Sequence, residues 1–141
     1  MSEVGAATAV FVVAVASVLA FVRTRRAGRL RAVVGPAVER VDKNAIGADL
    51  GTRATFVQFS SAFCRPCVAT RHVLSGVATA VPGVRHVEVD AESHLDLVRA
   101  LGVASTPTTL LVDSTGVVRR RATGVPRREA VLAALAEVVA D

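Results

Sequence analysis

The two cysteines of the chain both lie in the segment Phe63-Cys64-Arg65-Pro66-Cys67. An apolar, strand-like run at 54–59 precedes this segment, and apolar residues at helical spacing follow it over 68–81. The cysteines are therefore predicted to lie where a strand turns into a helix. Because strands and helices continue to alternate further along the chain, the predicted fold class is α/β.

This position favours reactive thiol chemistry. Free backbone N–H groups and the positive end of the helix dipole stabilise a thiolate, which is the species that attacks disulfides. We therefore predict that Cys64 is the nucleophile. Cys67 lies about one helical turn of ~3.6 residues further on and is predicted to resolve the mixed disulfide. Pro66 suits the first helical turn, and Arg65 adds positive charge, so both are expected to tune the pair.

A Cys-x-x-Cys pair alone does not establish redox chemistry, because the same spacing occurs in zinc sites. The obvious further ligands for zinc would be His72, His86 and His94. In the predicted helix His72 is turned about 140° away from Cys67, so it cannot join both thiols at one tetrahedral centre. We expect no metal and no cofactor besides a redox-active disulfide between Cys64 and Cys67.

Residues 4–22 form a run of nineteen residues without a charged side chain. As a helix this run would span about 28 Å, close to the roughly 30 Å of a bilayer's hydrocarbon core. A cleaved signal peptide would carry positive charge before the run, whereas here Glu3 precedes it and five arginines follow it. These flanks favour a retained single-pass transmembrane anchor. A buried core helix is disfavoured because the run is apolar on every face.

The arginines after the run are Arg23, Arg25, Arg26, Arg29 and Arg31. Because basic residues stay on the cytoplasmic side, they predict a cell-membrane protein with a cytoplasmic domain, and an extracytoplasmic domain is the alternative. They also carry most of the net charge of +5, since from residue 32 onward twelve basic side chains face eleven acidic ones. The sequence shows no basic, aromatic-bearing surface elsewhere, so nucleic acid is not an expected partner.

The chain is predicted to divide into an anchor at 1–22, a basic juxtamembrane linker at 23–43 and a domain at 44–141. A strand or short helix within 32–51 cannot be located from the pattern. The later pattern predicts strands at 54–59, 84–89, 108–112 and 117–121, and helices at 65–80, 90–101 and 126–139. The first strand-helix-strand unit implies that its two strands pair in parallel.

The order βαβαββα resembles the thioredoxin family over residues 44–140, with Cys-x-Pro-Cys opening a long helix and Thr106-Pro107-Thr108 before the third strand. The chain is also similar to membrane-anchored actinobacterial thioredoxin-like proteins with a Phe-Cys-x-Pro-Cys motif. This resemblance implies a thioredoxin-like fold, a central mixed sheet flanked by helices. It implies that Cys64 attacks, that Cys67 resolves and that Pro107 is a cis-proline beside them.

The resemblance also suggests how substrate binds. A cis bond before Pro107 would expose the backbone of Thr106, with which an extended substrate segment could pair as an added strand. Phe63 takes the position where thioredoxins usually have Trp. Phe63, Thr106 and Pro107 are therefore predicted to bind substrate. Without the cysteine pair, an ordinary trans proline at the end of a loop would be the better interpretation.

Gln58 departs from the family pattern. Six residues before the first cysteine, thioredoxins commonly bury an Asp that helps deprotonate the resolving cysteine, and an amide cannot act as that base. His86 or water could serve instead, although a solvated or packed histidine is the commoner case. Gln58 is therefore expected to tune the pair in a different way.

Two functions fit these observations. The first is a membrane-tethered thiol-disulfide oxidoreductase that acts on protein disulfides and is restored by a dithiol system such as thioredoxin reductase. The second is a non-catalytic thioredoxin-fold module that docks a membrane partner. The intact cysteine motif favours the enzyme, and Gln58 slightly favours the alternative. Because Arg-Pro separates the cysteines, without a histidine to stabilise the thiolate, we expect a reductant.

Overall fold

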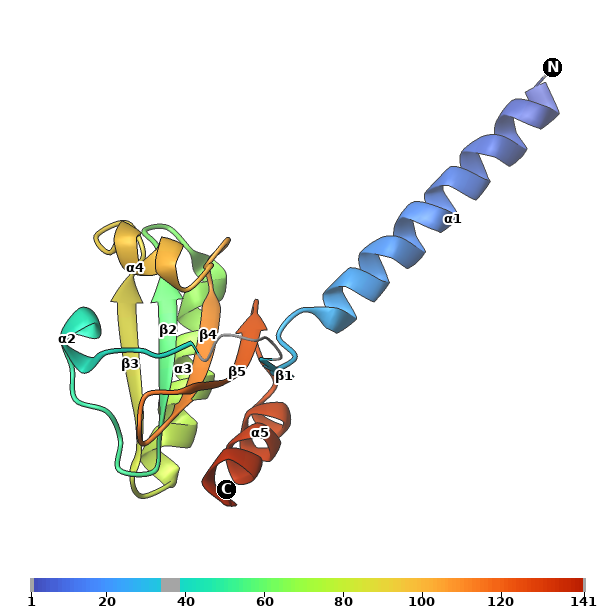
Figure 1. Ribbon diagram of the computed structural model, residues 1–141. Coiled ribbons are helices and arrows are strands. Elements are labelled where there is room, and N and C mark those ends of the chain that lie inside the picture. The colour runs from blue at the N-terminus through green and yellow to red at the C-terminus, as the bar shows by residue number, and fades with distance from the viewer. Residues whose placement is uncertain (1, 34–38, 141) are drawn as a thin grey trace.

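A long helix, α1 (Ser2–Arg26), leads into an α/β domain, as Figure 1 shows for the computed structural model. The structure describes residues 2–33 and 39–140. The segment Gly5–Arg26 is long and apolar enough to cross a membrane, with a mean hydropathy of 2.4. Large side chains along it, such as Val10 and Phe11, are 71% and 70% exposed. A helix that is apolar on every face needs apolar surroundings, so α1 is a candidate membrane span.

Within the described residues, the strands form one mixed sheet in the order β1-β5-β4-β2-β3. The strands are β1 (Arg31–Ala32), β2 (Ala54–Ser60), β3 (Val84–Asp90), β4 (Thr108–Asp113) and β5 (Val118–Thr123). β2 pairs with β3 in parallel, and the other neighbouring strands pair antiparallel. The predicted fold class and the predicted parallel pair are therefore confirmed.

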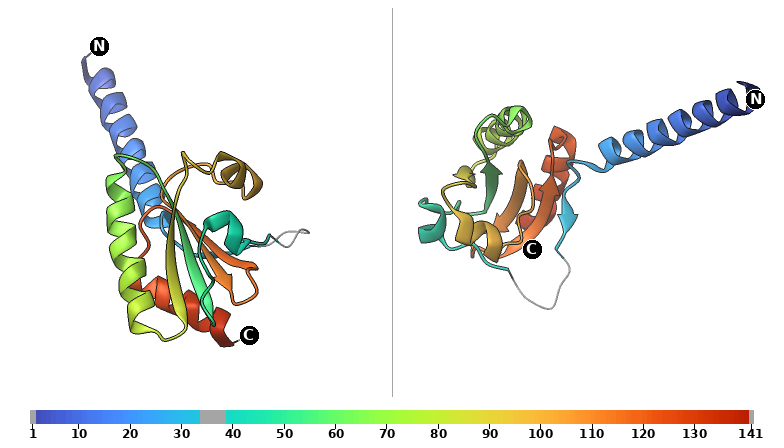
Figure 2. Two further views of the ribbon diagram at one scale, coloured as in Figure 1. Left: turned by 90° about the vertical axis from the view of Figure 1, so that its left-hand side faces the viewer. Right: turned by 90° about the horizontal axis from the view of Figure 1, so that it is seen from above.

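Helices cover both faces of this sheet. They are α2 (Lys43–Ile46), α3 (Arg65–Ala80), α4 (Leu95–Ala100) and α5 (Arg128–Ala140). Figure 2 shows α3 and α5 on one side of the sheet and α2 and α4 on the other. Phe56 and Leu111 pack toward α3 and α5, whereas Val57 and Leu110 pack on the opposite face. This alternation buries the whole of β2 and fixes its C-terminal end, which carries the cysteine loop.

The helix predicted at 90–101 is shorter than expected. Asp90 still belongs to β3, and its carboxylate accepts hydrogen bonds from the backbone N–H of Glu92 and the hydroxyl of Ser93. Such local hydrogen bonds compete with helix formation, so α4 begins only at Leu95. The last strand and helix also begin slightly later than predicted, at Val118 and Arg128, as their bounds above show.

The stretch predicted as linker contains regular structure. β1 pairs with the edge strand β5, with Arg31 opposite Arg121. Asp42 is the N-cap of α2, and its carboxylate accepts the backbone N–H of Asn44 at 2.8 Å. A two-residue strand and a one-turn helix have no measurable period, which explains why the pattern did not reveal them. Residues 34–38 of this stretch lie outside the described part, and the domain boundaries remain a prediction.

The residues directly after α1 contact the domain. Gly28, just beyond the helix, has a φ of 75° and donates its N–H to the carbonyl oxygen of Thr123 in β5. A Cβ atom at this position would lie 2.0 Å from the carbonyl oxygen of Val125. Glycine is therefore required both by the backbone conformation and by the close approach of the β5–α5 connection.

Candidate functional site

The two cysteines lie where β2 ends and α3 begins, as predicted. Cys64 is the N-cap of α3, and its Sγ accepts the backbone N–H of Cys67 at 3.2 Å. Pro66 occupies the first turn, where its missing N–H removes no intrahelical bond. Phe63 has a φ of 60°, a conformation that residues with a side chain adopt rarely. The loop therefore holds its aromatic ring outward, and Phe63 is fully exposed.

The cysteines form a disulfide in the structure, with the sulfur atoms 2.08 Å and the Cα atoms 5.3 Å apart. Their accessibility differs, because Cys64 is half-buried whereas Cys67 is 2% exposed. An incoming sulfur atom can approach Cys64 more easily than Cys67. This asymmetry is what an attacking and a resolving thiol require.

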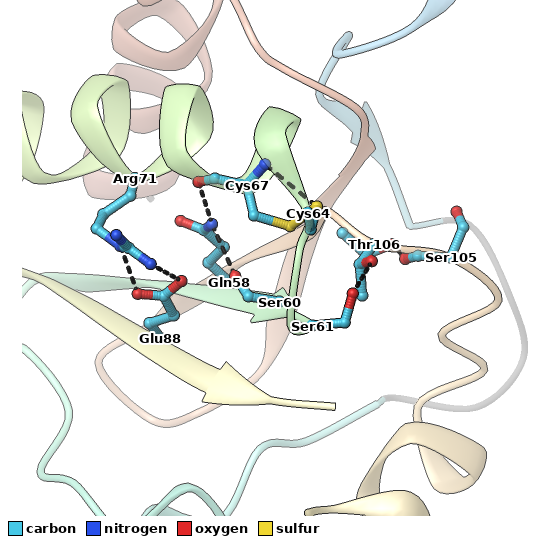
Figure 3. Close-up of a disulfide and its surroundings, with 10 residues drawn as sticks. Gln58, Ser60, Ser61, Cys64, Cys67, Arg71, Glu88, Ser105 and Thr106 are labelled. Carbon is cyan, nitrogen blue, oxygen red and sulfur yellow. Dashed lines mark hydrogen bonds and ion pairs between the residues drawn. A yellow bond between two sulfur atoms is a disulfide. The ribbon is translucent and has the colours of Figure 1, made fainter. Parts of the chain in front are cut away.

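The peptide bond between Thr106 and Pro107 is cis. Pro107 is buried, and its carbonyl oxygen accepts the backbone N–H of Gly124 at 2.9 Å. The Thr106 hydroxyl lies 2.8 Å from that of Ser61, and this contact joins the loop before Pro107 to the loop that carries Cys64 (Figure 3). The structure thus brings the predicted residues Thr106 and Pro107 together with the cysteine loop.

An open hollow of about 520 Å³ lies beside the disulfide. Its lining combines the cysteines with apolar and basic side chains, namely Ser61, Phe63, Cys64, Arg65, Cys67, Val68 and Arg71. Thr106 and Pro107 are not part of this lining and connect to it through Ser61. An approaching segment therefore meets an aromatic ring and two arginines around the sulfur of Cys64.

Gln58 is fully buried next to Cys67. Its Nε2 donates to the carbonyl oxygen of Cys67 and to the hydroxyl of Ser60, at 2.9 Å in each case. Its Oε1 lies 3.0 Å from Nε2 of His86, which must carry the proton because an amide oxygen only accepts. Gln58, which takes the position of the acid in the family pattern, therefore fixes the backbone of Cys67.

Strand alternation places His86 and Glu88 on the α3 side of β3, next to Gln58. Arg71 of α3 donates to both carboxylate oxygens of Glu88, at 2.6 and 2.8 Å (Figure 3). These hydrogen bonds hold the pKa of Glu88 below its ordinary value. Burial lowers the pKa of His86, and the charge of Arg71 adds to this effect while Glu88 opposes it. His86 is therefore mainly neutral at physiological pH.

In the described part of the chain, His86 is hydrogen-bonded to Gln58 and to neither cysteine. Its Nε2 bonds the amide of Gln58, which separates it from the cysteine. Among the described residues, no group of three or more His, Cys, Asp or Glu side chains could hold a metal ion. The chemistry that this arrangement offers is the exchange between a dithiol and a disulfide.

Sequence reasoning missed several residues of this site. Ser60 and Ser61 directly follow an apolar strand, but nothing in the pattern showed that they bond Gln58 and Thr106. The ion pair between Arg71 and Glu88 depends on the packing of α3 across β3. The alternation of β3 was the one available signal, since it places residues 86 and 88 on the same face.

We expect Gln58→Leu to lower the free energy of unfolding by about 1–3 kcal/mol, because buried polar groups of Cys67 and His86 would lose a partner. Urea unfolding of the oxidised full chain in detergent, followed by circular dichroism, measures this. Thr70→Val is the matched control, because the buried Thr70 hydroxyl has no hydrogen-bond partner among the described residues. Equal losses in the two variants would contradict the structural role of Gln58.

Acidification should destabilise the domain in two steps. The folded pKa of His86 lies below 6.5, so the unfolded chain takes up this proton first and stability falls as the pH drops below 6.5. The folded pKa of Glu88 lies below 4.5, so the stability that Glu88 contributes is lost only as the pH falls below that value.

The variant His86→Gln keeps an N–H donor and should remove the first step while it retains the second. Urea midpoints from neutral pH down to about pH 2.5 test both steps in the wild type and the variant. The prediction fails if the two profiles remain parallel between about pH 5 and 7.

The thioredoxin family model matches residues 40–137. Oxidised mitochondrial thioredoxin 3 from Saccharomyces cerevisiae is 21% identical, with a TM-score of 0.55, over 67% of this chain and 85% of that one. Chloroplastic thioredoxin z is 20% identical, with a TM-score of 0.58, over 77% and 100% of the two chains. A mutant thioredoxin from Halobacterium salinarum is 19% identical, with a TM-score of 0.57, over 62% and 76%. Among curated proteins, none matches the sequence.

The structural neighbours show the fold, and the family model covers most of the domain, including both cysteines and Pro107. The cysteine pair lies at disulfide distance at the start of α3. This chain belongs to the thioredoxin family and is a thioredoxin-like protein-disulfide oxidoreductase.

Proposed function

We propose that the protein is a membrane-tethered reductant of protein disulfides. The observation that carries this proposal is the asymmetric cysteine pair at the start of α3. Cys64 is half-buried beside the fully exposed Phe63, whereas Cys67 is buried behind it. The apolar helix α1 supports the tether, because it is long enough to cross a membrane and its apolar side chains are exposed.

The reaction starts from the reduced pair. The thiolate of Cys64, which accepts the N–H of Cys67, attacks one sulfur of a substrate disulfide, and the other substrate sulfur leaves as a thiolate that takes a proton from solvent. Cys67 then loses its proton and attacks Sγ of Cys64. The bond to the substrate breaks, so the substrate has gained two electrons and the enzyme holds the Cys64–Cys67 disulfide. A dithiol system such as thioredoxin reductase returns the enzyme to its reduced form.

Gln58 acts as a positioning residue in this scheme. It holds the carbonyl group of Cys67, and its amide cannot take the proton that Cys67 must lose. His86 donates its own proton to the amide oxygen of Gln58. We therefore propose that the proton of Cys67 leaves to water rather than to a buried carboxylate.

The substrate is proposed to bind along Phe63, Thr106 and Pro107. Phe63 presents an aromatic face to it, and the hydroxyl contact between Thr106 and Ser61 keeps the two loops together. Arg65 and Pro66 are both exposed in the first turn of α3, where they tune the charge and the backbone around Cys64.

We also propose that residues 4–22 anchor the protein in the cell membrane, as in anchored actinobacterial thioredoxin-like proteins. The linker is then 23–43 and the thioredoxin-like domain 44–141. The arginines after the apolar run favour a cytoplasmic domain, and an extracytoplasmic one is the alternative. A non-catalytic docking module would not need a cysteine pair at bonding distance, which favours the enzyme.

The cysteine roles predict different defects in two variants. In an insulin-disulfide reduction assay with the full chain in detergent, both Cys64→Ser and Cys67→Ser should lose turnover. Only Cys67→Ser should accumulate a mixed disulfide with the substrate, because its attacking thiol remains. Non-reducing electrophoresis detects this species. The control His72→Ala, an exposed position on α3, should keep wild-type turnover. Wild-type turnover in Cys64→Ser would refute the enzymatic function.

Membrane topology is tested by labelling in intact cells. After gentle reduction, a membrane-impermeant thiol reagent should label Cys64 only once the cells are permeabilised, because the domain faces the cytoplasm. A matched control carries Ser2→Cys together with Cys64→Ser and Cys67→Ser, and it should be labelled from outside. Labelling of Cys64 in intact cells would place the domain on the outer side instead.

A further inference from the structure

The junction between α1 and the domain lies two hydrogen-bonded steps from the active-site proline. Gly28 donates its N–H to the carbonyl oxygen of Thr123, and Thr123 pairs with Thr108 across β4 and β5. The next residue, Gly124, donates to the carbonyl oxygen of Pro107 at 2.9 Å. The chain therefore leaves the domain from the end of the sheet at which β4 begins and β2 ends, which is the end that carries the disulfide.

The ribbon views agree with this path. In Figure 1, α1 extends away on the side toward which the arrows of β2 and β3 point. In the left view of Figure 2, α1 extends upward beyond the level at which α3 begins, which is the end of the sheet that carries the cysteines. The opposite end of the sheet, with the turn between β4 and β5, lies away from α1.

The junction is held on both sides of the chain. Gly28 is buried, and a Cβ atom there would collide with the carbonyl oxygen of Val125. Leu30 packs against the core cluster beneath α5, and the chain enters β1 immediately afterwards. Only Ala27 separates the end of α1 at Arg26 from the buried Gly28. The direction of α1 relative to the domain is therefore set by contacts rather than by a free linker.

The charges around the junction suit a position at the level of lipid headgroups. An open hollow of about 620 Å³ there is lined mainly by arginines, namely Arg23, Arg26, Arg29, Arg31 and Arg121. Arg31 lies opposite Arg121, whose guanidinium already pairs with the carboxylate of Glu39 at 2.8 Å. Among the described residues, no carboxylate forms an ion pair with Arg23, Arg26, Arg29 or Arg31. Lipid phosphates would supply the negative charge that these four arginines lack.

We infer that the domain is held with its disulfide-bearing end toward the bilayer, so that its substrates are disulfides of membrane proteins located next to the headgroups. This inference rests on the proposed tethered reductase and names its substrate class. The exposed Phe63 and the partly exposed Val68 lie at this end, beside Cys64, and present an apolar surface to such a partner. Soluble disulfides can react with Cys64 in the same way, but we expect slower reduction because they are not held next to the membrane-facing end of the domain.

The test uses the full chain in vesicles of phosphatidylcholine with a minor fraction of phosphatidylglycerol. Three disulfide peptides of the same sequence are compared. One is attached directly to a transmembrane helix in the same vesicles, one is attached to that helix through a long flexible spacer, and one is soluble. The wild type should reduce the directly attached peptide several-fold faster than the spaced one.

In one variant, a flexible Gly-Ser segment of about 20 residues is inserted between Arg26 and Ala27. The ends of this segment lie roughly 25 Å apart on average, so the domain is no longer held in one orientation relative to α1. This variant should lose the preference for the directly attached peptide and reduce the soluble peptide at the wild-type rate. The matched control carries the same segment after Ser114, an exposed turn residue at the opposite end of the sheet, and should keep the preference.

The possible outcomes separate this inference from the function on which it rests. Equal rates on the two attached peptides in the wild type, or an unchanged preference in the Arg26–Ala27 insertion variant, would overturn the orientation while the reductase remains. Failure to reduce even the soluble peptide would overturn the proposed reductase, and the substrate class with it.

Discussion

The complete burial of β2 is the constraint on which the rest of the structure depends. Every residue of this strand is buried, so its backbone N–H and C=O groups must find partners on both edges, and its side chains must find partners on both faces. β3 and β4 supply the edges, and the two helix layers supply the faces. The cysteine loop begins where this enclosed strand ends, so the position of Cys64 is fixed by the best-packed part of the protein.

Gln58 shows how the same burial shapes the chemistry. A charged group at this place would lose its hydration, whereas a neutral amide needs only hydrogen bonds. The structure provides these bonds from Cys67, Ser60 and His86. With an amide in place of an acid, the site has no internal proton acceptor at residue 58, but the backbone of Cys67 is held by a hydrogen bond from Gln58. In the proposed mechanism, the resolving step would then depend on the access of water to the buried sulfur of Cys67.

The sequence allowed the α/β class, the parallel strand pair and the strand-to-helix position of the cysteines to be predicted, because each has a periodic or motif signal. The start of α4 was predicted wrongly, since apolar spacing does not register the turn that Asp90 stabilises. β1, α2 and the contact between Ser61 and Thr106 were not located either. They depend on short elements or on residues far apart in the chain, and such pairings follow from tertiary packing, which local pattern does not record.

The pairing of β1 with β5 links the N-terminal segment to the stability of the sheet edge. If proteolysis removed the chain up to Ala32, β5 would become an open edge whose unpaired backbone groups could accept a strand from another molecule. The three consecutive arginines of β5, which pair with Asp113, Glu137 and Glu39, would then line this edge with charged side chains that oppose strand addition. The N-terminal segment therefore also protects the edge of the sheet from pairing with a strand of another molecule.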